Sequence, residues 1–168
     1  MSLSMYTCSI PPLVRNLNNL AAILQKGADH AAAKGIDQSV FISARLAPDM
    51  FPLARQIQIT SDVSKGCAAR LCGIEAPVFE DTESSFDELQ KRITNTLQFL
   101  EAVLPEQADG SEDKEIVLKA GEKEFKFSGL SYLQSFVLPN VMFHTATAYN
   151  ILRHNGVEIG KMDFLGAP

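Results

Sequence analysis

The stretch SFDELQKRITNTLQFLEAVL, residues 85–104, carries the clearest helical pattern of the chain. It opens on Ser85 and Glu88, the two members of a capping box, in which each side chain satisfies a backbone N–H at the start of a helix. Apolar residues then recur every three or four positions, at Phe86, Leu89, Ile93, Leu97, Leu100 and Leu104. The pattern predicts an amphipathic helix that ends at Pro105.

Three further segments have helical periodicity, at about residues 10–34, 48–72 and 130–154. Pro11 and Pro12 fall in the opening turn of the first predicted helix, where their missing N–H groups cost little. Gly73 ends the second, because glycine readily adopts the left-handed conformation of a helix C-cap. Pro139 predicts a kink in the last one.

A β-hairpin is predicted between residues 116 and 127, ahead of the last helix. Ile116 and Leu118 alternate with polar neighbours, as do Phe125 and Phe127, on either side of a glycine turn at residues 120–121. Helices with matching apolar stripes, joined by short loops, pack most simply against one another. The sequence therefore predicts an all-α fold, an antiparallel four-helix bundle with a small β-hairpin before the last helix.

The chain is interpreted as one domain over residues 1–168, with residues 1–8 as a leader. Residues 159–168 look too short for an element of their own, and Phe164 and Leu165 are expected to fold back onto the helices. The length of 168 residues suits a single hydrophobic core.

Composition and charge exclude several classes of protein. The formal net charge is -5 and no dense Lys/Arg cluster is present, which argues against a nucleic-acid partner. No apolar run approaches the ~20 residues of a membrane span, so no membrane association is expected. The three cysteines form no C-x-x-C pair, and an odd number suits a reduced, cytoplasmic protein.

Polar residues on the predicted helix faces are the candidates for a site. Asn140 and His144 are four residues apart on the apolar face of the last helix. On the second helix, Arg55, Gln58 and Asp62 are neighbours at spacings of three and four. We predict that these five side chains line one inward cavity. The alternatives are a core histidine with one hydrogen-bonded neighbour, and a solvated helix face with an Arg–Asp pair.

Other chemistry has little support in the sequence. No G-x-S-x-G motif, local Cys–His arrangement or glycine-rich phosphate loop occurs. Five carboxylates gather at the start of the third helix, where they suit the positive end of the helix dipole and are interpreted as a solvated acidic corner: Glu80, Asp81, Glu83, Asp87 and Glu88.

Several strings resemble the DinB/YfiT-like superfamily of four-helix bundles, and within it a branch known only as a domain of unknown function. They are LAPDMFPL at 46–53, ARL at 69–71, SFDEL at 85–89, FHTATAYNILR at 143–153 and KMDFLG at 161–166. The resemblance covers nearly the whole chain, and it implies a metalloenzyme fold and a homodimer.

The resemblance also implies where a metal would bind. Many members of the superfamily hold a divalent metal with one histidine on the second helix and an H-x-x-x-H pair on the fourth. His144 matches the first member of that pair, whereas the second is Ala148. The ligand position on the second helix falls near Gln58, with Asp62 one turn later. We therefore expect a degenerate metal site, with no tightly bound metal and at most weak divalent binding at His144.

Three functions remain open from the sequence. The leading hypothesis is a small-ligand-binding or stress-associated bundle without established catalysis. The second is a metal-assisted or His-dependent enzyme of transferase or hydrolase type, with His144 as its general base. The third is a structural or partner-binding bundle whose inward polar residues only fix its packing.

Overall fold

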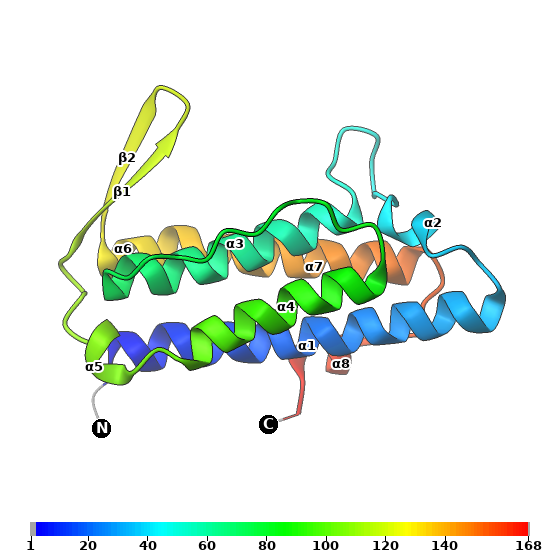
Figure 1. The fold of residues 1–168 in the computed structure, drawn as a ribbon, viewed down its shortest axis with the longest axis horizontal. Coiled ribbons are helices and arrows are strands. Elements are labelled where there is room, and N and C mark those ends of the chain that lie inside the picture. The colour runs from blue at the N-terminus through cyan, green and yellow to red at the C-terminus, as the bar shows by residue number, and fades with distance from the viewer. Residues whose placement is uncertain (1–2, 168) are drawn as a thin grey trace.

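The computed structural model describes residues 3–167 and is mostly helical, with one small antiparallel hairpin before the last long helix (Figure 1). These features of the predicted fold class are confirmed. The four long helices within the described residues are α1 (Met5–Lys34), α3 (Leu53–Cys72), α4 (Phe86–Glu101) and α7 (Leu138–His154). The short ones are α2 (Ser39–Ile42), α5 (Pro105–Ala108), α6 (Gly129–Tyr132) and α8 (Lys161–Leu165).

Helix α1 begins at Met5, earlier than the sequence pattern indicated. The Ser4 hydroxyl caps it by accepting from the Thr7 backbone N–H at 3.3 Å, and Met5 is buried. Residues 5–8, which were expected to precede the helix, therefore belong to it. Pro11 consequently lies in the second turn, where it cannot donate to the Thr7 carbonyl. Thr7 is exposed, so water can satisfy that oxygen.

The other helix boundaries also depend on local capping. Helix α3 begins at Leu53 and not near residue 48, and residues 44–52 precede it as irregular chain. The start of α4 agrees with prediction: Ser85 accepts from the Glu88 N–H at 3.2 Å, although the Glu88 carboxylate accepts from the N–H of Ser84. The predicted last helix is divided, because a π-helical turn, η1 (Leu133–Val137), lies between α6 and α7, directly before Leu138 and Pro139.

Residues 161–165 form a short helix, although residues 159–168 were expected to be too short for an element. Helix α8 packs on α1, where Asn19 donates to the Phe164 carbonyl at 3.1 Å and Arg15 donates to that of Leu165. The Phe164 ring meets the Tyr149 ring edge-on at 6.2 Å. The expected return of Phe164 to the helices is confirmed, whereas Leu165 is 44% exposed.

The core lies between the four long helices. Helix α1 packs on α4 and on α7, and α3 packs on the same two helices. Every predicted stripe contributes buried side chains to it, including Leu17, Leu20, Leu24, Ile57, Leu89, Val141 and Ile151. Over residues 3–167, no helix is both long and apolar enough to cross a membrane.

The directions of the helices differ from the prediction. Figure 1 shows α1 and α7 running one way and α3 and α4 running the other, so α3 and α4 are parallel neighbours. Their connection, residues 73–85, returns along the length of the helices, and we call it the crossover segment. Extended chain of that length reaches about 40 Å, whereas a helix of 20 residues is about 30 Å long. The expectation of short loops and antiparallel packing throughout is therefore wrong.

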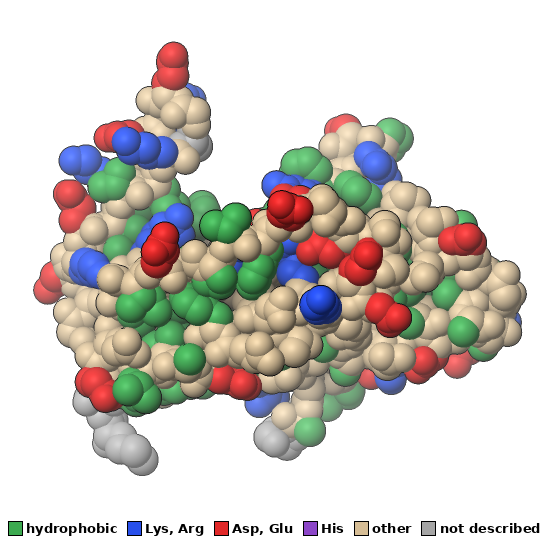
Figure 2. All heavy atoms as spheres, in the orientation of Figure 1, with side chains coloured by type: hydrophobic (Ala, Val, Ile, Leu, Met, Phe, Trp, Pro, Cys, Tyr) green, Lys and Arg blue, Asp and Glu red, His purple; other side chains and the backbone are tan. Residues whose placement is uncertain are grey.

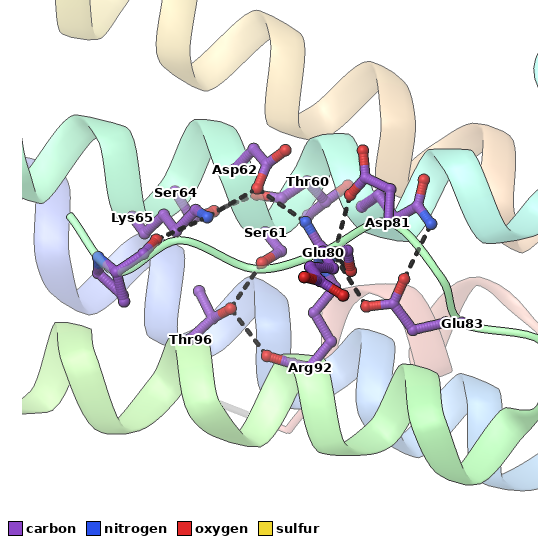
Figure 3. A network of polar contacts seen from close by, with 12 residues as sticks. Thr60, Ser61, Asp62, Ser64, Lys65, Glu80, Asp81, Glu83, Arg92 and Thr96 are labelled. Carbon is purple, nitrogen blue, oxygen red and sulfur yellow. Dashed lines mark hydrogen bonds and ion pairs between the residues drawn. The ribbon is translucent and has the colours of Figure 1, made fainter.

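Arg92 of α4 holds the crossover segment on the helices (Figure 3). Its side chain is 1% exposed and pairs with Asp81 at 3.0 Å and with Glu83 at 2.8 Å, and it donates to the Glu80 carbonyl at 3.2 Å. Burial opposes the charge, but the hydrogen bonds and charges of Glu83 and Asp62 outweigh it and raise the pKa of the guanidinium. Two carboxylates of the expected solvated corner therefore bind a buried arginine.

Lys65 of α3 makes a second attachment to the same segment. Its ammonium donates to the Pro77 carbonyl at 2.9 Å and lies 4.3 Å from the centre of the Phe79 ring. Asp62 joins the two cations, because it pairs with Lys65 at 3.0 Å and with Arg92 at 2.8 Å. The crossover segment is thus fixed to both helices that it connects.

The hairpin of β1 (Glu115–Ala120) and β2 (Lys123–Ser128) pairs Ile116 with Phe127 and Leu118 with Phe125. These four residues share one face, since side chains alternate along a strand. Figure 2 shows the hairpin standing away from the rest of the molecule, with charged side chains near its tip and hydrophobic ones where it meets the helices.

Replacing Arg92 tests its role in the fold. We expect Arg92→Met to lower the free energy of unfolding by about 3 kcal/mol, because the variant leaves Glu83 and its neighbours without their buried counter-charge. Urea unfolding followed by circular dichroism measures the change. Lys91→Met, on the exposed face of the same helix, is the matched control and should shift stability by less than about 0.5 kcal/mol. Equal effects of the two variants would contradict the role of Arg92.

Candidate functional site

His144 of α7 is half-buried and faces α3, with its Nδ1 atom 2.7 Å from the Oε1 atom of Gln56. Gln56 is in the first turn of α3 and is 1% exposed. Ala148, one turn beyond His144 on the same face, is fully buried against the core. The histidine therefore sits at the edge of the helix interface, with one ring nitrogen held by the opposite helix.

The surroundings of Gln56 fix the protonation of the imidazole. The Nε2 atom of Gln56 donates to the Phe51 carbonyl at 2.9 Å, and a carbonyl can only accept, so the amide nitrogen must face Phe51. The amide oxygen then faces His144, and because it too can only accept, His144 Nδ1 must carry a proton. In the neutral ring the Nε2 atom is left with a free lone pair.

The charge of the histidine is suppressed. Burial is the larger cause and the positive charge of Arg55 the smaller, and together they lower the pKa of His144 below its usual 6.5. The ring is therefore neutral at pH 7. A neutral imidazole with Nδ1–H anchored is the form that coordinates metals or accepts protons through Nε2.

The other predicted site residues on α3 turn away from His144. Gln58 donates to Glu83 at 2.9 Å, and Asp62 joins Arg92 and Lys65. Residues two apart on a helix point about 200° apart, so Gln56 and Gln58 lie on opposite flanks of α3. The structure thus brings Gln58 and Asp62 together on the crossover side, away from the imidazole.

Arg55 and Asn140 belong clearly to neither the His144 side nor the crossover side of α3. Arg55 donates to Gln58 Oε1 at 3.2 Å and pairs with Asp81, yet its charge still acts on His144. Asn140 is half-buried one turn before His144 and forms no side-chain hydrogen bond with the part of the chain that the structure describes. The five predicted residues are therefore divided between two environments.

Gln56 is the residue that sequence reasoning missed. It lies between Leu53 and Thr60 on the buried face of α3, whereas the predicted site residues Arg55, Gln58 and Asp62 were chosen by their spacing from one another. The signal was a glutamine on an apolar stripe, four residues before another polar residue. The resemblance put the ligand position of this helix near Gln58, but the residue that contacts His144 is Gln56.

These residues do not fit the three-histidine metal centre of the superfamily. The Gln56 oxygen is occupied by the Nδ1 proton of His144, and Ala148 has no donor atom. Among residues 3–167, no three His, Cys, Asp or Glu side chains are grouped so that they could hold a metal ion. Only His144 Nε2 remains as a nitrogen ligand here.

Comparison with known proteins gives this architecture a family. A family model described as a domain of unknown function, DUF1993, matches residues 5–165. The chain belongs to the DUF1993 family. Its match spans every helix and both strands described above, so the family resemblance inferred from the sequence strings is confirmed for the DUF1993 domain as a whole.

A solved structure places the DUF1993 chain among DinB-like folds. The crystal structure of a DinB family member protein from Shewanella denitrificans is 38% identical, with a TM-score of 0.87 over 97% of this chain and 92% of that chain. No curated protein matches the sequence. The crystal structure thus supports the fold of the DUF1993 domain and gives no function for it.

The protonation of His144 can be measured by NMR. We expect its imidazole to titrate below pH 6.5 and its neutral form to be protonated at Nδ1. Gln56→Glu should raise the pKa of His144, because a carboxylate stabilises the imidazolium. Nitrogen shifts of the three histidines give both results.

The lowered pKa of His144 also makes the free energy of unfolding depend on pH. Because the pKa of His144 is lower in the folded state, the unfolded chain binds the proton more readily. The stabilising contribution is therefore complete above about pH 6.5 and is lost as the pH falls through the window between the two pKa values. A titration midpoint for His144 at or above 6.5 would contradict this account.

Proposed function

We propose that this protein is a four-helix bundle that binds a small ligand at a degenerate metal site, through the Nε2 atom of His144. The observation that carries the proposal is the contact of 2.7 Å between Gln56 and His144 Nδ1. It presents a neutral ring with one free lone pair, oriented by a glutamine that is itself fixed by the Phe51 carbonyl. Such anchoring pre-organises a binding group and lowers the entropy that binding costs.

The surroundings of His144 indicate what kind of ligand fits. The ring of Phe143 meets the imidazole edge-on at 5.2 Å and is 58% exposed, and Phe51 is 55% exposed. Arg55 lies 5.9 Å from the centre of the Phe51 ring. A molecule with an apolar part and one O–H or N–H donor would use the phenylalanines and the lone pair together. The charge of Arg55 disfavours a cation in this place.

A His-dependent enzyme is the second candidate, and the same hydrogen bond favours it. In nucleophilic catalysis a base must be held in one tautomer by a third group, and Gln56 holds His144 in this way. The imidazole would then take a proton at Nε2 from a substrate hydroxyl or from water. The lowered pKa keeps the base unprotonated at neutral pH, which suits a transferase or hydrolase reaction.

The degenerate metal site makes a direct prediction. After dialysis the protein should hold no stoichiometric Zn²⁺ or Ni²⁺, because a single imidazole supplies too few donors. Gln56→His adds a second imidazole opposite His144 at little change in volume, and we expect it to raise the affinity for Zn²⁺ at least about tenfold. Calorimetric titration measures both.

His144→Ala should abolish the gained affinity in the Gln56→His background, and His154→Ala, on the same helix, is the matched control that should retain it. Stoichiometric metal that survives dialysis of the unaltered protein and is lost with His144 would refute the degenerate site.

Ligand binding itself can be tested with a fragment library. Aromatic fragments that carry one hydroxyl or amide donor should shift the Nε2 signal of His144 on titration, and the signal of His154 should stay in place. Gln56→Leu should reduce the effect, because the imidazole then loses its fixed tautomer. If binders perturb neither His144 nor the Phe143 ring, the proposed site is wrong.

A further inference from the structure

A concave site lies where the hairpin meets the helices, away from His144. It is a pocket of about 540 Å³, within the range of small-molecule sites. Most of its wall is apolar and comes from both strands, from α3, from α6 and from the π-helical turn. These side chains are Val63, Leu118, Phe125, Phe127, Tyr132 and Phe136.

The hairpin creates the pocket by being anchored only at its base. On its apolar face, Ile116 is 4% exposed and packs in the core, whereas Phe125, nearer the tip, is 47% exposed. The outer part of this face therefore has little to pack against and overhangs α3. Below it, Phe127, Tyr132 and Phe136 form an aromatic cluster with ring centres 5.7–6.2 Å apart.

The positive charge that lines the pocket exceeds the negative charge. Asp62 lies there, but Lys65 and Arg92 already neutralise it. Arg70 also lines the pocket, and within residues 3–167 it forms no ion pair with a carboxylate. The Lys119 ammonium is 74% exposed and pairs only at 3.3 Å with the exposed Glu124, which holds it weakly. The pocket therefore carries uncompensated positive charge.

Arg70 is also positioned for a ligand. Its guanidinium lies 5.8 Å from the centre of the Tyr132 ring and donates to the Tyr132 hydroxyl at 3.1 Å. A Cβ at Gly66, one turn earlier on α3, would overlap this guanidinium, so the glycine leaves it room to lie along the helix.

The Tyr132 hydroxyl accepts from Arg70, since a guanidinium can only donate, and its own proton has no acceptor among the described residues. Burial raises the pKa of Tyr132 to about 12, so that proton stays in place at pH 7. Because Tyr132 is fully buried, its hydroxyl holds the exposed Arg70 in place, and Arg70 offers a charged donor beside an aromatic surface.

We propose that this pocket binds an amphiphilic aromatic anion, with its rings between Phe125 and the Phe127–Tyr132–Phe136 cluster and its acidic group on Arg70, which the Tyr132 hydroxyl holds in place. The site is separate from His144, which lies eight residues beyond Phe136, about 12 Å along the helix. Binding at this pocket therefore does not depend on the function proposed for His144.

Two fluorescent probes with one ring system test the proposal. 8-Anilinonaphthalene-1-sulfonate is an aromatic anion, and N-phenyl-1-naphthylamine is the same molecule without the sulfonate. We expect the folded protein to bind the sulfonate about tenfold more tightly than the neutral amine, because one charge-assisted hydrogen bond contributes about that factor. Phe125→Ser, at a partly exposed position, should weaken both probes.

Arg70→Met should weaken the sulfonate about tenfold and leave the neutral probe within about twofold, a split that a loss of folding would not produce. The matched control is Arg15→Met, at an apolar cavity of about 550 Å³ between α1 and α8. This variant should change neither affinity, and melting curves confirm that each variant is folded. Equal affinities for the two probes, an unchanged sulfonate affinity in Arg70→Met, or a loss in Arg15→Met equal to that in Arg70→Met would overturn the proposal.

Discussion

The buried guanidinium of Arg92 is the interaction on which the arrangement of the helices depends. It gathers Asp62 from α3 with Asp81 and Glu83 from the crossover segment. A parallel pair of neighbouring helices needs a connection as long as the helices themselves. In this one Ile74 packs against the core but Val78 is 92% exposed, so the segment needs a further attachment. Arg92 and Lys65 supply that attachment through charge, carbonyl hydrogen bonds and the Phe79 ring. Pairing of nearly every charge offsets the cost of burying the guanidinium, although Arg92 Nε is buried without a partner within the described residues.

This network also determines which polar side chains of α3 are not engaged in holding the crossover segment. Gln58 and Asp62, which the sequence offered as site residues, are used by the crossover segment and hold Glu83 and Arg92. On the opposite flank of α3, Gln56 meets His144, and the pair leaves one nitrogen lone pair at the edge of the interface. A single helix thus has a structural flank and a flank suited to binding, two residues apart in sequence. The separation follows from the helical turn of about 100° per residue.

The hairpin adds a concave surface away from His144. Its strands bury Ile116 at the base but carry Phe125 outward, so a continuous apolar face is only partly covered. The π-helical turn ahead of Pro139 places Phe136 beneath it, in contact with Tyr132 and Phe127. Irregular helical turns of this kind often occur at functional sites, because they redirect side chains that a regular helix would carry elsewhere.

The sequence by itself determined the four long helices, the presence of the hairpin and the DinB-like family, because apolar periodicity, the Ser85 cap and the strand alternation are local properties of the chain. The turn expected at residues 120–121 is one residue too early, since Ala120 pairs with Lys123 and the turn is at residues 121–122. It did not determine the helix directions, since the crossover segment is held by Arg92, a contact between residues that no local pattern connects. It placed His144 with Gln58 and Asp62, whereas the half-buried imidazole contacts Gln56 on the other flank of α3. Which of Gln56 and Gln58 meets the imidazole depends on the rotation of α3 against α7, and only the packing of the two helices in the tertiary structure sets that angle.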